Sequence, residues 1–151
     1  MQLPQPDDVL DARARIHKHI RVTPVMQSDS LDALTGMTLF WKCENLQRAG
    51  AFKFRGATNA VLQLDDATRA RGVATHSSGN HGAALALAAQ RAGLPATVVM
   101  PSNSVASKRA AVETFGGLVV SCEPTAAARV AGLEQVVRET GATPVHPFEH
   151  P

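Results

Sequence analysis

The sequence predicts an α/β fold, in which an open, mostly parallel β-sheet carries helices on both faces. Two observations lead to this prediction. From Gly56 onward, short apolar runs rich in valine alternate with longer segments whose apolar residues recur at helical spacing. The connections between these segments are only a few residues long, and glycine or proline marks most of them. Repeated strand–helix–strand alternation of this kind is typical of parallel sheets that are buried on both faces.

The first third of the chain predicts two helices and one strand. Over residues 7–20, apolar residues recur at intervals of three and four, which places them on one face of a helix. These apolar positions are Val9, Ala12, Ile16 and Ile20. Residues 28–36 begin with serine and aspartate, which are common helix caps, and end with Gly36, so we expect a short second helix. Residues 37–45 are a compact apolar and β-branched run, which predicts a strand that ends in a polar turn.

The rest of the chain predicts helices and strands in alternation. Apolar periodicity and terminal glycines predict helices over residues 56–72, 80–93, 104–117 and 125–141. Short runs between them predict strands over residues 73–76, 95–101, 118–123 and 143–146. No stretch has the composition of a flexible linker or a low-complexity segment.

Composition narrows the classes of partner. Hydrophobic residues make up 44% of the chain and charged residues 19%, which is typical of globular proteins. No apolar run approaches the roughly 20 residues that a membrane-spanning helix needs, so we expect no membrane partner. The formal charge of +2 comes without a basic run, and the aromatic content is only 4%, so we expect no nucleic-acid partner. Residues 1–20 have acidic residues before basic ones and no apolar core of a signal peptide, which predicts a cytoplasmic protein.

Residues 75–89, "THSSGNHGAALALAA", place a polar loop between a short strand and a helix. Hydroxyl groups, glycines and free backbone N–H groups at the start of a helix bind anions, because the unpaired donors and the helix dipole both favour negative charge. We therefore expect a carboxylate or a phosphate to bind at this loop. Its candidate ligands are Ser77, Ser78, Asn80 and His81. Ordinary capping of the helix by serine or asparagine is the alternative that these residues alone leave open.

A single lysine, Lys53, stands between Phe52 and Phe54 in the stretch "AGAFKFRGATNA". In an extended or turning segment neighbours alternate sides, so the two phenylalanines can anchor on one side while the amine projects to the other. A solvated lysine has a pKa of about 10.4 and is a poor nucleophile at neutral pH. Desolvation, or a nearby cation such as Arg55, favours the neutral amine, which can bond covalently to a carbonyl group. The alternative is a structural lysine whose stem packs on its aromatic neighbours.

Three stretches follow one another in a recognisable order: "KCENLQRAGAFKFRGATNAV", "THSSGNHGAALALAA" and "LPATVVMP". In residues, order and spacing they resemble the fold-type II pyridoxal-phosphate enzymes, specifically the serine/threonine dehydratase and serine racemase group. The likeness extends to "RIHKHIRVTPV" upstream and to "CEP" and "VHPFEHP" downstream, so it covers nearly the whole chain.

The resemblance implies a role for each candidate residue. Lys53 would carry pyridoxal 5'-phosphate covalently, with Phe52 behind it and near the cofactor ring. The substrate carboxylate would be held by Ser77, Ser78, Asn80 and His81. Asn80 would also contact the ring hydroxyl of the cofactor. Ser78 would lie on the cofactor face opposite the lysine, so that Lys53 and Ser78 are the implied catalytic residues.

The same resemblance implies a lyase that removes water and ammonia from a small β-hydroxy amino acid. Serine, threonine and hydroxyaspartate are the candidate substrates, and the products are a 2-oxo acid and ammonia. If Ser78 returns a proton to the other face of the substrate, racemisation results. A noncatalytic anion-binding module with a structural Lys53 is one alternative. A β-replacing enzyme with the same cofactor is another, although those enzymes more often show Ser-x-Lys-Asp-Arg, so the Phe-Lys-Phe-Arg-Gly sequence favours dehydration.

By analogy with the family, residues 1–69 are the N-terminal part of a large cofactor-binding domain and residues 70–149 are a small α/β domain. Family members are longer, and their second half carries a glycine-rich loop for the cofactor phosphate and the group that meets the pyridine nitrogen. Neither feature occurs in the 151 residues. We therefore expect this chain to be part of a longer protein, inactive alone and homo-oligomeric at full length.

Two histidine patterns complete the candidates. Residues 146–150, "HPFEH", match the H-x-x-E-H pattern of some zinc proteases, which needs both histidines on one helix. Pro147 and Pro151 bracket the segment and oppose a helix, so we expect a loop and no metal. His76 stands at a strand end, where it either packs or supports the serine loop, and the sequence does not choose between these roles.

Overall fold

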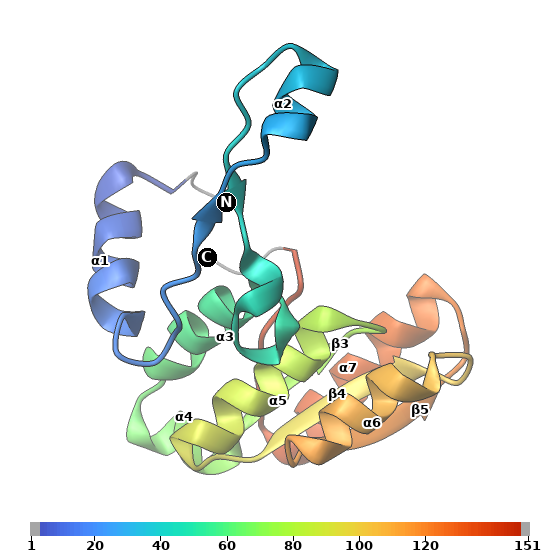
Figure 1. The fold of residues 1–151 in the computed structure, drawn as a ribbon. Helices are drawn as coiled ribbons and strands as arrows, with labels where there is room; N and C mark the ends of the chain where they lie inside the picture. Colours follow the sequence, from blue (N-terminus) through green and yellow to red (C-terminus); the bar gives the residue numbers. More distant parts are fainter. Residues whose placement is uncertain (1–3, 149–151) are drawn as a thin grey trace.

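The computed structural model describes residues 4–148 and contains a four-stranded parallel sheet (Figure 1). Its strands, in spatial order, are β5 (Leu118–Cys122), β4 (Ala96–Pro101), β3 (Val73–His76) and β6 (Thr143–Pro144). Every neighbouring pair runs parallel. The predicted α/β class and the parallel pairing are therefore confirmed, and the last strand is two residues shorter than expected.

Helices cover both faces of this sheet, as predicted. Figure 1 shows α5 (Asn80–Ala92) and α6 (Ala106–Thr114) in front of the strands and α7 (Ala126–Thr140) behind them. Successive residues of a strand point to opposite faces. Val98 of β4 accordingly packs in a cluster with α5 and α6, whereas its neighbour Val99 packs with Leu133 and Val136 of α7. Burial on both faces explains why the central strands read as continuous apolar runs.

Helix α3 (Lys53–Leu62) packs across α5 and carries Lys53 at its first position. Its apolar side joins small residues of α5 in one cluster that contains Phe54, Ala57, Ala60, Val61, Ala84, Leu85 and Ala88. The prediction of a single helix over 56–72 was wrong, because a second helix, α4 (Asp66–Arg71), begins after a break. The side chain of Asp65 accepts a hydrogen bond from the Thr68 backbone N–H at 2.8 Å, which caps the new helix and separates it from α3.

The N-terminal segment is built from short elements. These are α1 (Pro6–Ile16), β1 (Val25–Met26), α2 (Asp29–Thr35), β2 (Trp41–Lys42), and the 3-10 turns η1 (Glu44–Leu46) and η2 (Arg48–Gly50). Strands β1 and β2 pair antiparallel, and α2 extends away from the sheet (Figure 1). No helix in residues 4–148 is both long and apolar enough to cross a membrane.

Two predictions for this segment were wrong in extent. The first helix ends at Ile16 instead of residue 20, because the chain closes a tight turn there, in which the His19 N–H donates to the Ile16 carbonyl at 2.8 Å. Ile20 packs against the core from beyond this turn, so its helical spacing from Ile16 did not place it in the helix. The predicted strand over 37–45 pairs only at β2, because β1 offers just two partner residues. The helix predicted over 28–36 is confirmed, with Gly36 left-handed at its end.

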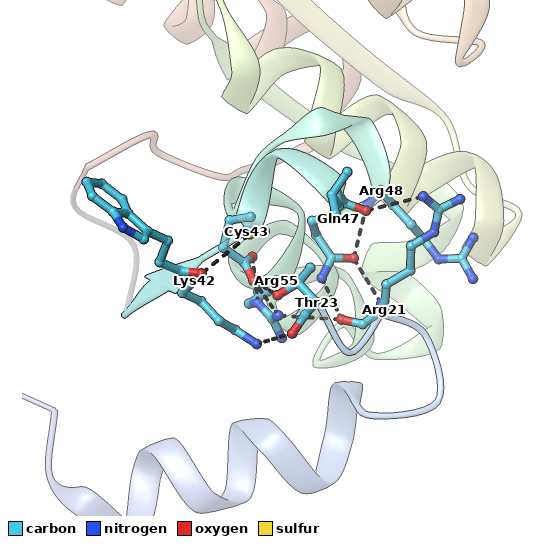
Figure 2. Close-up of polar contacts among 10 residues, drawn as sticks. Arg21, Thr23, Lys42, Cys43, Gln47, Arg48 and Arg55 are labelled. Atoms are coloured by element: carbon cyan, nitrogen blue, oxygen red, sulfur yellow. Dashed lines mark hydrogen bonds and ion pairs between the residues drawn. The ribbon is translucent and has the colours of Figure 1, made fainter. Parts of the chain in front are cut away.

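A polar network fastens the N-terminal segment to the first turn of α3 (Figure 2). The Glu44 carboxylate accepts hydrogen bonds from Arg55 Nε at 2.9 Å, Arg55 Nη2 at 2.6 Å and the Thr23 hydroxyl at 2.6 Å. The Gln47 side chain accepts from the Arg21 N–H at 2.9 Å and donates to the Arg21 carbonyl at 2.8 Å. The Arg55 guanidinium holds the pKa of Glu44 at about 2, well below its ordinary value. We call Thr23, Glu44 and Arg55 the Glu44 cluster.

Candidate active site

A cavity of about 310 Å³ lies where the start of α3, the start of α5 and the segment after β6 meet. That volume is at the lower end of the range for small-molecule sites. The structure brings all the sequence-predicted site residues to its wall, namely Phe52, Lys53, Ser77, Ser78, Asn80 and His81. They come from two segments that are separated along the chain, and they meet at the carboxyl edge of the parallel sheet, where open α/β sheets bind ligands.

The Lys53 amine is held in the wall of this cavity. Its Nζ donates a hydrogen bond to the Pro147 carbonyl oxygen at 2.7 Å. It also lies 5.5 Å from the ring centroid of Phe52 and 5.7 Å from that of Phe148. No acidic side chain lines the cavity in the described part of the chain. The amine is therefore bound by a neutral acceptor and two aromatic faces.

The prediction that Phe52 and Phe54 anchor on one side was wrong. Lys53 begins a helix, and successive residues of a helix point in directions about 100° apart, whereas those of a strand alternate sides. Phe54 is fully buried in the core, whereas Phe52 is 59% exposed and stays beside the amine. Arg55, which was considered as a cation acting on Lys53, is paired with the Glu44 carboxylate instead.

The serine loop presents backbone donors to the cavity. Strand β3 ends at His76, and the Ser77 hydroxyl accepts a hydrogen bond from the Gly79 N–H at 3.2 Å. Gly79 is the residue that precedes α5, and no side chain caps the first turn of that helix. A Cβ atom on Gly82 would lie 2.9 Å from Val98 Cγ1, so glycine allows the helix to start close against β4. The uncapped N–H groups and the hydroxyls suit an anion.

His81 contributes differently from the other loop residues. Its imidazole is buried, and its Nε2 lies 3.1 Å from the Val145 carbonyl oxygen. The side chain thereby links α5 to the segment after β6. What His81 can offer to a carboxylate in the cavity is its backbone N–H at the start of α5.

Sequence reasoning missed two positive groups in this cavity and one titratable group beside it. Lys108 and Arg129 line it, from the first turns of α6 and α7. A signal was available, because helices that follow parallel strands all begin at the same edge of the sheet, so basic residues in their first turns converge there. His146 was considered only as part of a metal motif, and its Nε2 lies 3.3 Å from Nε2 of His76. Glu149 and His150 of that motif lie outside the described residues.

The electrostatics of the cavity are positive. His76 is only 6% exposed, and burial, followed by the nearby His146 and Arg129, holds the pKa of His76 below its ordinary value. Nδ1 of His76 and Nε of Arg129 are buried and have no hydrogen-bond partner within residues 4–148. Together with Lys53 and Lys108, these groups make a cavity that favours a negatively charged guest.

A family model of pyridoxal-phosphate dependent enzymes matches residues 16–151. The chain belongs to this family. It is 50% identical over 151 residues to the β-hydroxyaspartate dehydratase of Paracoccus denitrificans, a match that covers all of this chain and 48% of the relative. It is 43% identical to the L-threo-3-hydroxyaspartate ammonia-lyase of a Pseudomonas species, again over all of this chain and 47% of the relative.

The fold matches a solved member of the same group. The structure of maize serine racemase superposes with a TM-score of 0.93 at 46% identity, over 95% of this chain and 44% of that chain. The chain thus spans about half the length of the relatives that it matches. The α/β class predicted from the sequence is the fold of these enzymes.

The residues present fit the family's cofactor. Pyridoxal phosphate is an aldehyde that enzymes attach through a lysine amine, and such a lysine must be free of a carboxylate partner and accessible from a cavity. Lys53 meets both conditions, because its partner is the Pro147 carbonyl and its side chain lines the cavity. Phe52 supplies an aromatic face beside the amine, and Asn80 supplies a polar side chain from the opposite wall.

Proposed function

We propose that this chain supplies the lysine and the carboxylate-binding loop of a pyridoxal-phosphate-dependent lyase. The lyase converts a small β-hydroxy amino acid to a 2-oxo acid and ammonia, with racemisation as a possible side activity through Ser78. One observation carries the proposal: Lys53 and the 77–81 loop line the same cavity. A helix start that binds a carboxylate, in the same cavity as a lysine amine, has the two groups that orient an amino acid and accept its Cα proton.

The roles of the chain's residues follow from their chemistry. The backbone N–H groups of Asn80 and His81, with the hydroxyls of Ser77 and Ser78, bind and orient the substrate carboxylate. Pyridoxal phosphate, when it carries the amino acid in place of Lys53, would withdraw electrons from the Cα atom and so make its proton acidic. The Lys53 amine, free at that stage, would accept that proton. The β-hydroxyl group leaves as one water molecule. A second water molecule is consumed when the remaining nitrogen is released as ammonia and the 2-oxo acid forms.

Among the candidate substrates, hydroxyaspartate is favoured by the charges in the cavity. Arg129 and Lys108 line it with no acidic side chain from residues 4–148 beside them, and a second carboxylate would satisfy them. Arg129→Gln is expected to raise the KM for hydroxyaspartate about tenfold or more, the worth of a charge-assisted hydrogen bond, and to change the KM for serine less. Equal effects on the two substrates would favour serine or threonine as the natural substrate.

The experiment that tests the reaction uses the intact protein, meaning this chain with any coding sequence that continues it. After incubation with pyridoxal phosphate and reduction with borohydride, mass spectrometry of peptides is expected to find the cofactor on Lys53. Lys53→Ala is expected to abolish both the labelling and the release of ammonia. Lys18→Ala, a change of an exposed lysine, is the matched control and is expected to alter neither.

The two alternatives give different results in the same experiment. A noncatalytic anion-binding module would show no cofactor on Lys53, and Lys53→Ala would leave anion binding unchanged. A β-replacing enzyme would require an added thiol or similar nucleophile before product appears. The proposed lyase releases ammonia and a 2-oxo acid without one.

Three further expectations remain proposals. Residues 1–69 and 70–149 are proposed as parts of a large and a small domain, which limited proteolysis of the intact protein checks. A homo-oligomer is proposed by family resemblance, which light scattering after gel filtration measures. A cytoplasmic location is proposed from composition, and fractionation of expressing cells tests it.

A further inference from the structure

The position of the Lys53 amine depends on a short segment that follows the last strand. Strand β6 has only two residues, and residues 146–148 follow it, with Pro147 and Phe148 in the wall of the cavity. Within this segment the Pro147 carbonyl accepts the hydrogen bond from Lys53, and the Phe148 ring lies against the same amine. Whatever fixes residues 146–148 therefore also fixes Lys53 whenever its amine is free.

His146 organises this segment through both of its ring nitrogens. Its Nδ1 accepts a hydrogen bond from the Phe148 backbone N–H at 3.3 Å, and its ring contacts the Phe148 ring at 5.8 Å between centroids. Its Nε2 lies 3.3 Å from Nε2 of His76, with the two rings edge to face. His76 belongs to β3, in the interior of the sheet, so it provides a rigid point of attachment.

One arrangement of protons satisfies both of these contacts. Since Nδ1 of His146 accepts from a backbone N–H, a neutral His146 carries its proton on Nε2 and donates to His76. Nε2 of His76 is then the acceptor, and a neutral His76 carries its proton on the buried Nδ1. A second proton on His76 would sit on Nε2, so that two N–H groups faced each other and the bond between His76 and His146 was lost. If the His146 proton moved to Nδ1 instead, the bond from the Phe148 N–H would be lost. Protonation of His76 therefore breaks one of these two hydrogen bonds in either case.

Among the described residues, burial, His146 and Arg129 all oppose a charge on His76 and lower its pKa. The other charged and titratable groups that line the cavity, among the described residues, are Lys53 on α3, His81 on α5, Lys108 on α6 and Arg129 on α7, and His146 contacts His76 directly. None of them is acidic. A neutral His76 is therefore the form that this cavity favours.

We propose that His76 is a positioning residue for Lys53: by accepting a hydrogen bond from His146, it fixes residues 146–148 and thereby the carbonyl that holds the amine. This inference rests on the proposed function for its importance to the reaction. The contacts on which it depends are those of the Lys53 amine without a bound cofactor, so the experiment needs no cofactor. It resolves the choice that the sequence left open for His76 in favour of support to the site.

The test measures how reactive the Lys53 amine is in the intact protein, as purified and without added cofactor. Reductive methylation followed by mass spectrometry gives the reactivity of Lys53 relative to the exposed Lys18 in the same sample. His76→Leu removes the acceptor and is expected to raise the relative reactivity about fivefold, the worth of one hydrogen bond. His76→Gln keeps an acceptor at the position of Nε2 but does not titrate, and it is expected to resemble the wild type at about pH 8. His17→Gln, on an exposed histidine, is the matched control and is expected to change nothing.

The pH profile separates positioning from a merely structural role. In the wild type, the relative reactivity of Lys53 is expected to rise only once the pH is well below the ordinary histidine pKa of about 6.5, because burial lowers the pKa of His76 and so delays its protonation. His76→Gln is expected to abolish that rise. A profile that is the same in the wild type and in His76→Gln would overturn the proposal, and so would wild-type reactivity in His76→Leu.

A second measurement keeps the inference testable if a variant does not fold. Nitrogen-15 NMR of the wild-type histidines at about pH 8 is expected to find His76 protonated on Nδ1 and His146 on Nε2. The opposite tautomers, or a cationic His76, would refute the arrangement. If borohydride does not fix the cofactor on Lys53 while the tautomers and the reactivity profile hold, the proposed function fails and the positioning of Lys53 by His76 stands.

Discussion

The Glu44 cluster offers the sharpest test of how the N-terminal segment is attached. Replacing Glu44 by Gln keeps the size of the side chain and removes its charge, so Arg55 loses its partner and Thr23 keeps at most a neutral acceptor. In the wild type, the Glu44 carboxylate receives three hydrogen bonds, two of them in the paired geometry that arginine makes with carboxylates. We expect the substitution to lower the free energy of unfolding.

The magnitude follows from the proton affinity of Glu44. Its pKa is lowered from 4.5 to about 2, which corresponds to about 3 kcal/mol at 1.36 kcal/mol for each tenfold change in affinity. The Glu44 side chain is 20% exposed, so solvent screens part of this energy. We therefore expect Glu44→Gln to cost about 2 kcal/mol near neutral pH. Because the pKa is lowered on folding, this contribution is present above pH 4.5 and is lost as the pH falls toward about 2.

Urea denaturation of the intact protein between about pH 7 and pH 3 measures both the size and the pH dependence. Glu134→Gln is the control, because Glu134 and Arg138 form a largely exposed pair one helical turn apart at 3.9 Å. Such pairs contribute about 0.5 kcal/mol or less. The reasoning is refuted if the two variants lose the same stability, or if the loss at Glu44 is independent of pH.

Other substitutions test the packing, the helix caps and the backbone. Gly82→Ala is expected to cost about 1–3 kcal/mol in urea denaturation, because the new Cβ would lie 2.9 Å from Val98 Cγ1; a neutral effect would show that α5 can move away from β4. Gly56→Ala, in a helix with open space around the new atom, is expected to stabilise by about 0.5–1 kcal/mol, and a loss would mean that the helix needs glycine there. Thr125→Ala removes the hydroxyl that accepts from the Ala128 N–H and is expected to cost about 1 kcal/mol, measured as a lower Tm.

Local patterns were sufficient for most of the sheet and its helices. The strands from Val73 onward and the helices between them were predicted because each depends on residues close in sequence: periodic apolar positions, β-branched runs and terminal glycines. Errors fell mainly at the ends of elements. The first helix gives way to a turn after Ile16, Asp65 caps a new helix inside the predicted span 56–72, and β2 is short because its partner β1 is short.

Some residues of the candidate site could be found from the sequence, and others only from the structure. The motif around Lys53 and the serine loop could be found in the sequence, because each is a continuous stretch whose residue types carry the chemistry. Lys108 and Arg129 could not be assigned in this way, since each stands alone in its own helix and joins the cavity only through the order of the strands. The pairing of Arg55 with Glu44 was likewise invisible, because the two residues meet only after η1 and η2 turn the chain back.

The sequence by itself determined the α/β class and picked out Lys53 and the serine loop as candidate site residues, because these are encoded by neighbouring residues. Only the tertiary structure decided that Lys53 starts a helix, that the Pro147 carbonyl holds its amine, and that His76 meets His146. The physical reason is that β6 lies beside β3 in the sheet although 66 residues separate His76 from Thr143, the first residue of β6. Such neighbours result from strand order, which no local pattern specifies.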